Sequence, residues 1–253
     1  MNKGFWAMPQ FFIKSKNVKD QNIFLDNKSD LKHLKTVLRC KIGDEILLID
    51  DAENLYTAKI SEISQNFIKL EILHKEKSTR SLKIDLTLFQ SVLKSQAQDF
   101  VIQKTTEIGA KKIQPVISKY TVVKFENQKD ILKKTEKWQK IAFESCKQCE
   151  RSKAPEILPP IPLKEAIKLD FDIKIACIER NAKISLKEFL RKTPCQEEQK
   201  IALFIGPEGG WANEEIELFN KNNITKVSLG NMILRAETAV ITALSGVVYE
   251  YEN

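Results

Sequence analysis

The sequence predicts an α/β domain with a largely parallel sheet, preceded by a small β-rich domain. From about residue 84 onward, apolar strand candidates alternate with helix candidates, which is the pattern of parallel strands joined by helical crossovers. Between about residues 11 and 73, short apolar runs are separated by turn-like polar residues. The connector 75–81 has no apolar residue, so we expect the domains to be 1–77 and 78–253.

The elements of the first domain follow from short apolar runs. A helix is expected over 33–39, ending ahead of Gly43 and Asp44. The strands expected after it are 45–49, 56–60 and 67–73.

The elements of the second domain are longer and more regular. A glycine at position 109 is placed to cap the helix that ends at residue 108, and Asn213, followed by two glutamates, is expected to cap the helix that begins there. The expected strands are 84–89, 112–117, 173–178, 201–205 and 226–229, and the expected helices are 97–108, 130–149, 213–221 and 236–251.

Composition limits the class of protein. The chain has 41 Lys and Arg residues against 34 Asp and Glu residues, and the net charge of +7 is spread along the sequence. This balance suits an anionic partner such as nucleic acid, although a lysine-rich solvated surface has the same signature. No apolar run approaches the ~20 residues of a membrane span. Residues 1–6 contain no sustained apolar stretch, so we expect no export signal, no membrane partner and a cytoplasmic location.

The five cysteines are odd in number and widely scattered, which does not indicate a disulfide framework. Cys146 and Cys149 have the spacing of half a zinc site, but no second CxxC follows and the two histidines lie far upstream. We therefore expect no metal. The two thiols are interpreted as lying on or near the buried face of a helix.

Two glycine-bearing segments follow predicted strands. The first, GPEGGW at 206–211, connects the strand 201–205 to a helix, and its glycines let backbone groups approach a ligand at the end of a strand. It matches neither the GxGxxG nor the P-loop pattern, and a tight connection alone explains this many glycines poorly. The second, LGNMILRAETA at 229–239, leaves another strand through Gly230 and reaches Arg235 and Glu237 at a helix start. Taken alone, Arg235 and Glu237 would be interpreted as a surface ion pair. Because a second glycine-bearing segment precedes them in the chain, the two segments together indicate a ligand site.

These two segments resemble the signature pair of the ribosomal RNA small subunit methyltransferase E family, within the SPOUT superfamily. The likeness extends over most of the chain. QKTTEIG at 103–109 and ESCKQCER at 144–151 resemble two further motifs of the family, and residues 33–44 resemble its N-terminal PUA-like RNA-binding domain. In this order along one chain, the motifs are highly specific.

The resemblance implies a SPOUT α/β domain that ends in a deep trefoil knot, which sequence physics would not propose because knots are rare. It implies a homodimer and S-adenosylmethionine (SAM), held by backbone groups of 206–210 and 229–234 and enclosed by apolar side chains. The cofactor-binding residues so expected are Leu203, Ile205, Gly206, Pro207, Glu208, Gly209, Gly210, Leu229, Gly230, Ile233, Leu234, Arg235, Thr238 and Ala239.

The resemblance also implies methylation of N3 of a uridine in 16S rRNA of the small ribosomal subunit. We expect Arg235 to stabilise charge that develops on a uracil carbonyl, and Glu208 or Glu237 to position the base or take its proton. Because N3 lies on the Watson–Crick edge, the target must be unpaired or extruded. The residues expected to contact RNA are Lys32, Lys35, Arg39, Lys104 and Arg151.

Three positions depart from the family pattern. Gln10 stands where the family usually has arginine, Glu150 replaces a common glycine, and Lys119-Tyr120-Thr121 lacks an arginine often found beside that strand. These departures put particular RNA contacts in doubt and leave the cofactor fold unaffected.

Two alternatives remain at this point. The chain could be another SPOUT methyltransferase that acts on a different base or on a ribose 2′-hydroxyl, or a non-catalytic rRNA-binding assembly factor. The PUA-like domain and the Arg-x-Glu-Thr ending favour N3 methylation. The intact ligand loops argue against the assembly factor.

Overall fold

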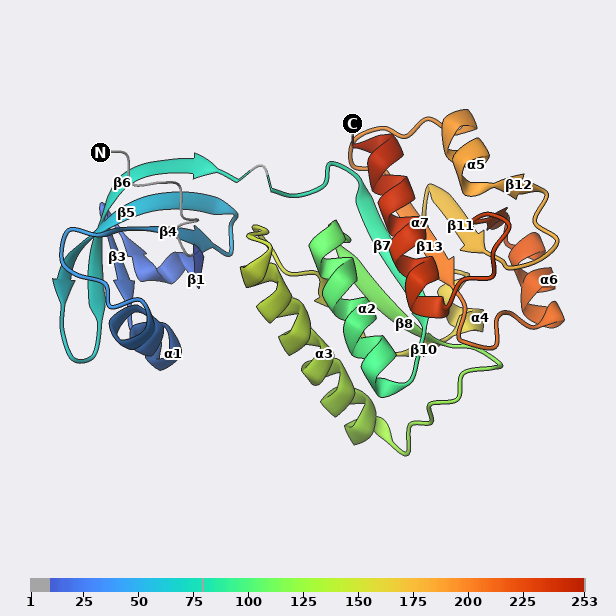
Figure 1. Cartoon of the computed structure of the whole chain (residues 1–253), viewed down its shortest axis with the longest axis horizontal. Helices are drawn as coiled ribbons and strands as arrows, with labels where there is room; N and C mark the ends of the chain where they lie inside the picture. Colours follow the sequence, from blue (N-terminus) through green and yellow to red (C-terminus); the bar gives the residue numbers. More distant parts are fainter. Residues whose placement is uncertain (1–9, 79, 253) are drawn as a thin grey trace. The chain divides into compact units, whose positions relative to one another are not determined.

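The computed structural model describes residues 10–78 and 80–252. The segment 1–6, for which we expect no export signal, lies outside these residues. The chain divides into two compact units, one formed by Met1–Ser81 with Glu150–Lys153 and the other by Leu82–Cys149 with Ala154–Asn253 (Figure 1). Nothing in the sequence indicates that residues 150–153 return to the first unit.

The first unit is a sheet of short strands with helical turns beside it. The strands follow the order β1-β4-β5-β6-β3-β2, and β1 and β4 are its parallel pair. Their side chains enclose a core that includes Ile23, Leu34, Leu48 and Ile60. The strands are β1 (Gln10–Ile13), β2 (Val18–Lys19), β3 (Asn22–Leu25), β4 (Glu45–Asp50), β5 (Asn54–Ile63) and β6 (Ile68–Lys77), and the helical turns are η1 (Ser15–Asn17), α1 (Lys28–Lys32) and η2 (His33–Val37).

Two expectations for this unit need correction. Strand β6 continues to Lys77, because β5 pairs with it as far as Asn54 opposite Lys77, so residues 75–77 are strand rather than connector. The helical segment begins at Lys28 rather than at residue 33, because the Asn27 side chain accepts a hydrogen bond from the Ser29 N–H at 3.0 Å. Residues 33–37 continue it as a π-helical turn.

The second unit is a parallel sheet in the order β10-β8-β7-β13-β11-β14-β12, with β9 beside β8. Every described pairing in it is parallel, so the carboxyl ends of its strands meet at one edge. The strands are β7 (Asp85–Ser91), β8 (Lys112–Ile117), β9 (Glu156–Ile157), β10 (Ile161–Pro162), β11 (Ile173–Cys177), β12 (Ile184–Ser185), β13 (Lys200–Ile205) and β14 (Thr225–Ser228).

Helices cover both faces of this sheet. Leu88 and Leu203 belong to the core on the face of α2 (Ser95–Ile108), α3 (Gln128–Gln148) and α7 (Ala236–Tyr251), which lie beside one another in Figure 1. Phe89 and Phe204 belong to the core on the opposite face, where their rings stack with centroids 4.5 Å apart. The remaining helices are α4 (Leu163–Ala166), α5 (Leu186–Lys192) and α6 (Asn213–Lys221). The expected parallel α/β domain after a β-rich domain is confirmed.

The helix ends distinguish a correct prediction from a wrong one. Gly109 does end α2, with φ +120° and its N–H bonded to the Thr105 carbonyl at 3.2 Å. Asn213 is not the cap of α6, because Ala212 takes that place and its N–H donates to Glu215 Oε2 at 2.9 Å. None of the helices in the described part of the chain combines the length and apolar character that a membrane crossing requires.

Candidate functional site

Three loops at the carboxyl edge of the second sheet enclose a cavity. They follow β11, β13 and β14, which pack side by side with β11 in the middle. The cavity between them has a volume of about 50 Å³. Its walls are Cys177, Ile178, Glu179, Ile205, Gly206, Pro207, Gly210, Trp211, Leu229, Gly230, Met232, Ile233, Leu234, Ala236 and Ala239.

The wall formed by loop 206–212, which follows β13, is held by hydrogen bonds. Gln90 Nε2 donates to the Gly206 carbonyl at 3.1 Å, and the Gly210 N–H donates to the Pro207 carbonyl at 2.9 Å. Trp211 Nε1 donates to the carbonyl of Cys177 at the end of β11, at 2.9 Å. These bonds tie the loop to β7 and to β11, so this wall exists before any ligand binds.

Side chains at two glycines of this wall would be closely packed. Gly210 has φ +68°, and a Cβ on it would lie 3.2 Å from Glu179 Oε1. A Cβ on Gly206 would lie 3.3 Å from the Trp211 ring. The backbone therefore forms the cavity surface at these points.

The wall formed by loop 229–235, which follows β14, is more open. Gly230 has φ +129°, and a Cβ placed on it would meet nothing within 4 Å. Met232 is 81% exposed and Ile233 is 62% exposed. Two large apolar side chains thus stand in solvent at the mouth of an apolar cavity, where a ligand would cover them.

The cavity is apolar and carries little charge. Glu179 is the one charged residue among those that line it. Burial raises the pKa of the Cys177 thiol to about 12, so this thiol is neutral at physiological pH and presents a small, weakly polar surface. A flat heterocycle would find apolar contact here and backbone groups for hydrogen bonding.

A charged cleft adjoins the cavity. It is lined by the start of α2 and the start of α7, and it shares Glu179, Pro207, Ile233, Leu234 and Ala236 with the cavity. Glu208 is held within it, because Glu208 Oε1 accepts a hydrogen bond from the Lys94 N–H at 3.3 Å. Its further lining residues are Lys94, Ser95, Gln96, Ala97, Glu208, Arg235 and Glu237.

The structure places most of the predicted site residues around these two spaces. Ile205, Gly206, Pro207, Gly210, Leu229, Gly230, Ile233, Leu234 and Ala239 line the cavity, and Arg235, Glu208 and Glu237 come together in the cleft.

Five predicted cofactor contacts do not line the cavity: Glu208 and Arg235 line the cleft, and the other three line neither space. Leu203 shares a face of β13 with Ile205, but it is fully buried in the sheet core, two residues before the carboxyl end of the strand. Gly209 lies against Tyr120 instead, where a Cβ would come within 3.0 Å of Tyr120 Cβ. Thr238 is exposed on the first turn of α7 and lines neither space.

Several lining residues were not predicted. Glu179 and Lys94 each follow a strand end, and that position was the available signal, but neither residue lies in a glycine-rich motif. Trp211 closes the first motif and was not assigned a role. Trp211 donates its hydrogen bond to Cys177, which lies on a strand far away in sequence, so no local pattern indicates this contact.

The residues expected to contact RNA differ in how accessible they are. Lys32 and Arg39 are exposed on the first unit. Lys35 is held by the turn between β5 and β6, since its Nζ donates to the Gln65 carbonyl at 3.1 Å. In the second unit, Lys104 forms an ion pair with Glu107 at 2.8 Å, and its side chain is 33% exposed. Lys32 and Arg39 are therefore the freest of these cations.

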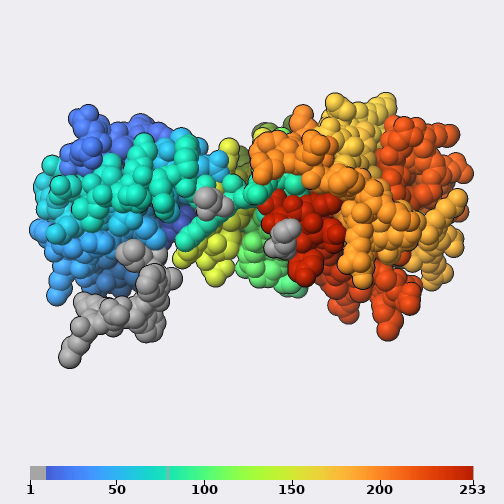
Figure 2. Space-filling view, turned by 90° about the horizontal axis from the view of Figure 1, so that it is seen from above, coloured from blue at the N-terminus to red at the C-terminus, as the bar shows by residue number. Residues whose placement is uncertain are grey.

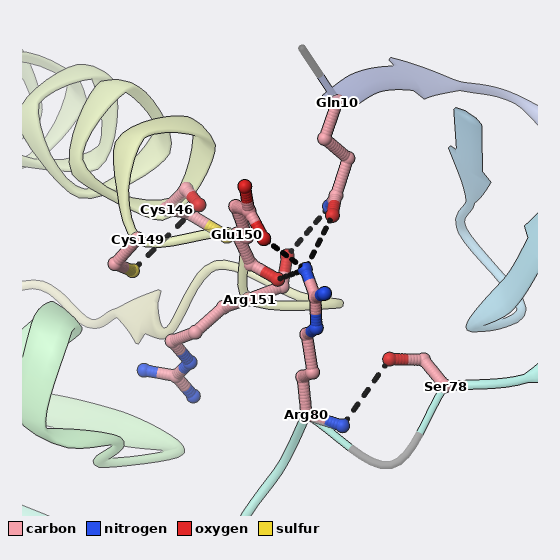
Figure 3. A network of polar contacts seen from close by, with 7 residues as sticks. All are labelled: Gln10, Ser78, Arg80, Cys146, Cys149, Glu150 and Arg151. Atoms are coloured by element: carbon pink, nitrogen blue, oxygen red, sulfur yellow. Dashed lines mark hydrogen bonds and ion pairs between the residues drawn. The ribbon is translucent and has the colours of Figure 1, made fainter. Parts of the chain in front are cut away.

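Arg151 does not lie where it was expected. It belongs to the first unit and is 8% exposed, and its carbonyl accepts a hydrogen bond from Gln10 Nε2 at 3.2 Å (Figure 3). Arg80 pairs with the Glu150 carboxylate and also contacts Gln10 Oε1 at 3.4 Å. The two departures from the family pattern, Gln10 and Glu150, thus meet in one network around Arg80. In this unit they hold residues 150–151 against β1.

The third departure lies next to loop 206–212. The Lys119 ammonium pairs with Glu214 at 2.8 Å, and this hydrogen bond raises the pKa of Lys119 and lowers that of Glu214. The Lys119 N–H donates to Glu215 Oε1 at 2.8 Å. Tyr120, packed on Gly209, remains 46% exposed. The segment after β8 therefore supports loop 206–212 from outside the cavity.

Matches to known families show that the chain is an RNA methyltransferase. The family described as RNA methyltransferase domain matches residues 80–248, and the family described as RNA methyltransferase PUA domain matches residues 25–73. The chain belongs to the ribosomal RNA small subunit methyltransferase E family, as the sequence motifs predict.

Individual relatives cover nearly the whole chain. A ribosomal RNA small subunit methyltransferase E from Buchnera aphidicola (subsp. Schizaphis graminum) is 30% identical over 246 residues, which are 96% of this chain and 97% of the relative. The Mesomycoplasma hyopneumoniae relative is 32% identical over 240 residues, which are 94% of this chain and 98% of the relative. The crystal structure of the Neisseria gonorrhoeae protein bound to SAM is similar with a TM-score of 0.82 and 28% identity, covering 96% and 98%.

Proposed function

We propose that this protein transfers a methyl group from SAM to N3 of a uridine in 16S rRNA. The observation that carries the proposal is the shared wall between an apolar, glycine-lined cavity and a cleft that contains Arg235, Glu208 and Glu237. A methyl donor in the first space and a nucleobase in the second would be neighbours. The relatives named ribosomal RNA small subunit methyltransferase E, and the SAM-bound structure from Neisseria gonorrhoeae, support this choice of donor and substrate.

The residues present fit SAM. The backbone of Gly206 and Gly210 forms the cavity surface, where a Cβ would be in tight contact with Trp211 or Glu179. Ile205, Leu229 and Ile233 would enclose an adenine ring, and the loop backbones would supply its donors and acceptors. When bound, SAM supplies an electrophilic methyl group on a positively charged sulfur.

The cleft residues supply the acid–base chemistry. Methylation at N3 requires loss of the N3 proton, so the base becomes more negative on its carbonyl oxygens as it reacts. We assign stabilisation of that charge to the Arg235 guanidinium. The proton passes to a carboxylate, Glu208 or Glu237, which releases it to solvent after the reaction. Glu208 is positioned for this role by its hydrogen bond from the Lys94 N–H.

RNA recognition needs an unpaired or extruded uridine, because N3 is on the Watson–Crick edge. The exposed cations Lys32 and Arg39 of the first unit are proposed to contact the phosphate backbone, whose charge dominates nucleic-acid affinity. Substrate within the small ribosomal subunit would place the protein in the cytoplasm.

The trefoil knot is a proposal that strand order supports. Strand β14 lies on the far side of β11 from β13, yet α7, which follows β14, packs against α2 and β13. Loop 229–235 therefore returns across the carboxyl edge of the sheet, past the loops that follow β11 and β13. Such a return is the chain path that a knot requires.

The homodimer is likewise a proposal. A groove between α5 and α7, helices that lie side by side in Figure 2, is lined by Leu186, Leu190 and Tyr249. Tyr249 is 75% exposed, and exposed aromatic residues are typical of protein interfaces. We propose this groove as the dimer surface, which sedimentation of the purified chain tests.

The function is tested in cells and in solution. Mass mapping of 16S rRNA from cells that lack this gene is expected to show loss of one N3-methyluridine, restored by the wild-type gene. In single-turnover assays, Arg235→Ala should lower the methylation rate by roughly 100-fold or more, with SAM still bound. An unchanged rRNA map would refute the proposed function, and loss of a methyl group at another base or at a ribose hydroxyl would reassign the substrate.

A further inference from the structure

We infer that Glu179 makes the site prefer the charged methyl donor over its neutral product. The inference rests on the proposed function and adds a residue that selects between two forms of the same ligand. The cavity and the cleft share five residues. Among Glu179, Pro207, Ile233, Leu234 and Ala236, Glu179 alone has an ionisable side chain.

The location of Glu179 is set by the sheet. It stands two residues beyond the end of β11, where the Ile178 N–H donates to the Val227 carbonyl at 2.9 Å and the Cys177 carbonyl accepts from Trp211 at 2.9 Å. Its Oε1 lies 3.2 Å from the position that a Cβ on Gly210 would occupy. The carboxylate therefore lies over the rigid wall of the cavity, at its border with the cleft.

The carboxylate of Glu179 has no protein partner within residues 10–78 and 80–252, since no hydrogen bond or ion pair engages it there. Glu208, by contrast, is already bonded to the Lys94 N–H. The Glu179 side chain is exposed to solvent, and the other described residues that line the cavity are uncharged. Lys94, Glu208, Arg235 and Glu237 line the adjoining cleft. A ligand that covers the carboxylate would exclude water from it and so strengthen its interaction with a cation. A cationic ligand group at this border would supply the missing partner.

The proposed reaction brings such a cation to this border. A methyl group that leaves a donor in the cavity for a base in the cleft must cross between them, so the donor sulfur lies near the shared wall. SAM carries a positive charge on that sulfur. After transfer, the bonding electron pair remains on sulfur, and the product, S-adenosylhomocysteine, is a neutral thioether. A carboxylate beside the sulfur attracts the donor and loses that attraction once the product forms.

This attraction favours loading of the donor and release of the product, at some cost to the rate of the chemical step. The sulfur loses charge as the reaction proceeds, so Glu179 stabilises the bound donor more than the transition state. Its benefit is that product dissociates readily and fresh donor replaces it.

Calorimetric titration of the purified full-length protein tests the inference with three ligands: SAM, S-adenosylhomocysteine and sinefungin. In sinefungin a carbon atom that bears an ammonium group replaces the sulfur that bears the methyl group. In Glu179→Gln, SAM and sinefungin should each bind about five- to tenfold more weakly, while the affinity for S-adenosylhomocysteine changes less than about twofold. Glu198→Gln is the matched control. Glu198 precedes β13 at the opposite edge of the sheet, with an 82% exposed side chain, and its variant should bind all three ligands like the wild type.

The possible outcomes separate the inference from the function on which it rests. Equal weakening of all three ligands in Glu179→Gln would place Glu179 at a part that they share, and would overturn the inference. So would unchanged affinities. If the wild-type protein bound none of the three, the proposed function itself would fail, and the inference with it.

Discussion

The two loops that wall the cavity are built in opposite ways. Loop 206–212 is tied to its surroundings, with Gly206 bonded to Gln90 and Trp211 bonded to the end of β11. Loop 229–235 places Met232 and Ile233 in solvent and has an open face at Gly230. One wall is thus rigid before binding, and the other presents apolar surface that only an occupant would cover.

The difference shows how the site divides its tasks. A preorganised wall has little conformational entropy to lose on binding, so it can set the orientation of the ligand. An open wall allows entry and exit, and its burial on closing contributes to affinity. We expect substitutions in the first wall to act through shape and those in the second to act through buried apolar area.

The largest effect is expected at Gly210. Gly210→Val should weaken SAM binding about 100-fold, because strain and crowding together cost roughly 3 kcal/mol. Gly230→Val is the matched control, since Gly230 also has a positive φ but a Cβ there meets no atom within 4 Å. It carries at least as much backbone strain, at φ +129° against +68°, without the close contact to Glu179, and we expect a loss of about tenfold or less. Calorimetric titration measures both affinities.

Equal losses in these two variants would contradict the contrast between a rigid and an open wall. Backbone strain, which the variants share, would then explain both results without any effect of close contact at Gly210.

A middle-sized effect is expected from the exposed apolar pair. The double variant Met232→Ala, Ile233→Ala should bind SAM about tenfold more weakly, because truncating both side chains removes apolar area that binding would bury. The melting temperature of the ligand-free protein should stay within about 1 °C of the wild type, because these side chains are exposed. A marked fall in that melting temperature would show that they pack in the ligand-free state, and would remove the basis for calling this wall open.

The smallest effect on binding is expected at Trp211. Trp211→Phe keeps an aromatic ring but leaves the Cys177 carbonyl without its donor, which should cost about 1–2 kcal/mol of stability. For a domain of this size, the melting temperature should fall by roughly 2–8 °C. SAM affinity should change only about two- to threefold, since the glycine backbone remains. Thermal denaturation followed by circular dichroism, with calorimetry in parallel, checks both, and a loss of affinity larger than that of Gly210→Val would contradict the assignment.

Long elements were predictable because their patterns are local. Helix α7 was expected over 236–251 and occupies Ala236–Tyr251, and β8 was likewise expected over its observed range. The elements that were missed are short, such as β9, β10 and β12 with two residues each, and a strand of that length has no detectable periodicity. Strand β3 was missed because its four residues gain stability from pairing with β6 rather than from local pattern.

The candidate site was predictable where residues follow a motif and hidden where they do not. The two glycine segments indicated most of the cavity, and Arg235, Glu208 and Glu237 do meet in the cleft. Leu203 lies on the same face of β13 as Ile205, but it is inside the core rather than at the edge of the sheet, and adjacency to a motif does not reveal that difference. The ion pair between Lys104 and Glu107 explains why a basic residue in a family motif need not present a free charge.

The sequence by itself determined the family, the parallel α/β class and the two loops, because glycine patterns and apolar periodicity are properties of neighbouring residues. Only the tertiary structure decided that β11 lies between β13 and β14, and this order brings Glu179 to the border of the cavity and the cleft. It also decided that residues 150–153 join the first unit through Arg80 and Gln10. Such contacts join residues far apart in the chain, and their free energy depends on burial and geometry that only the folded protein has.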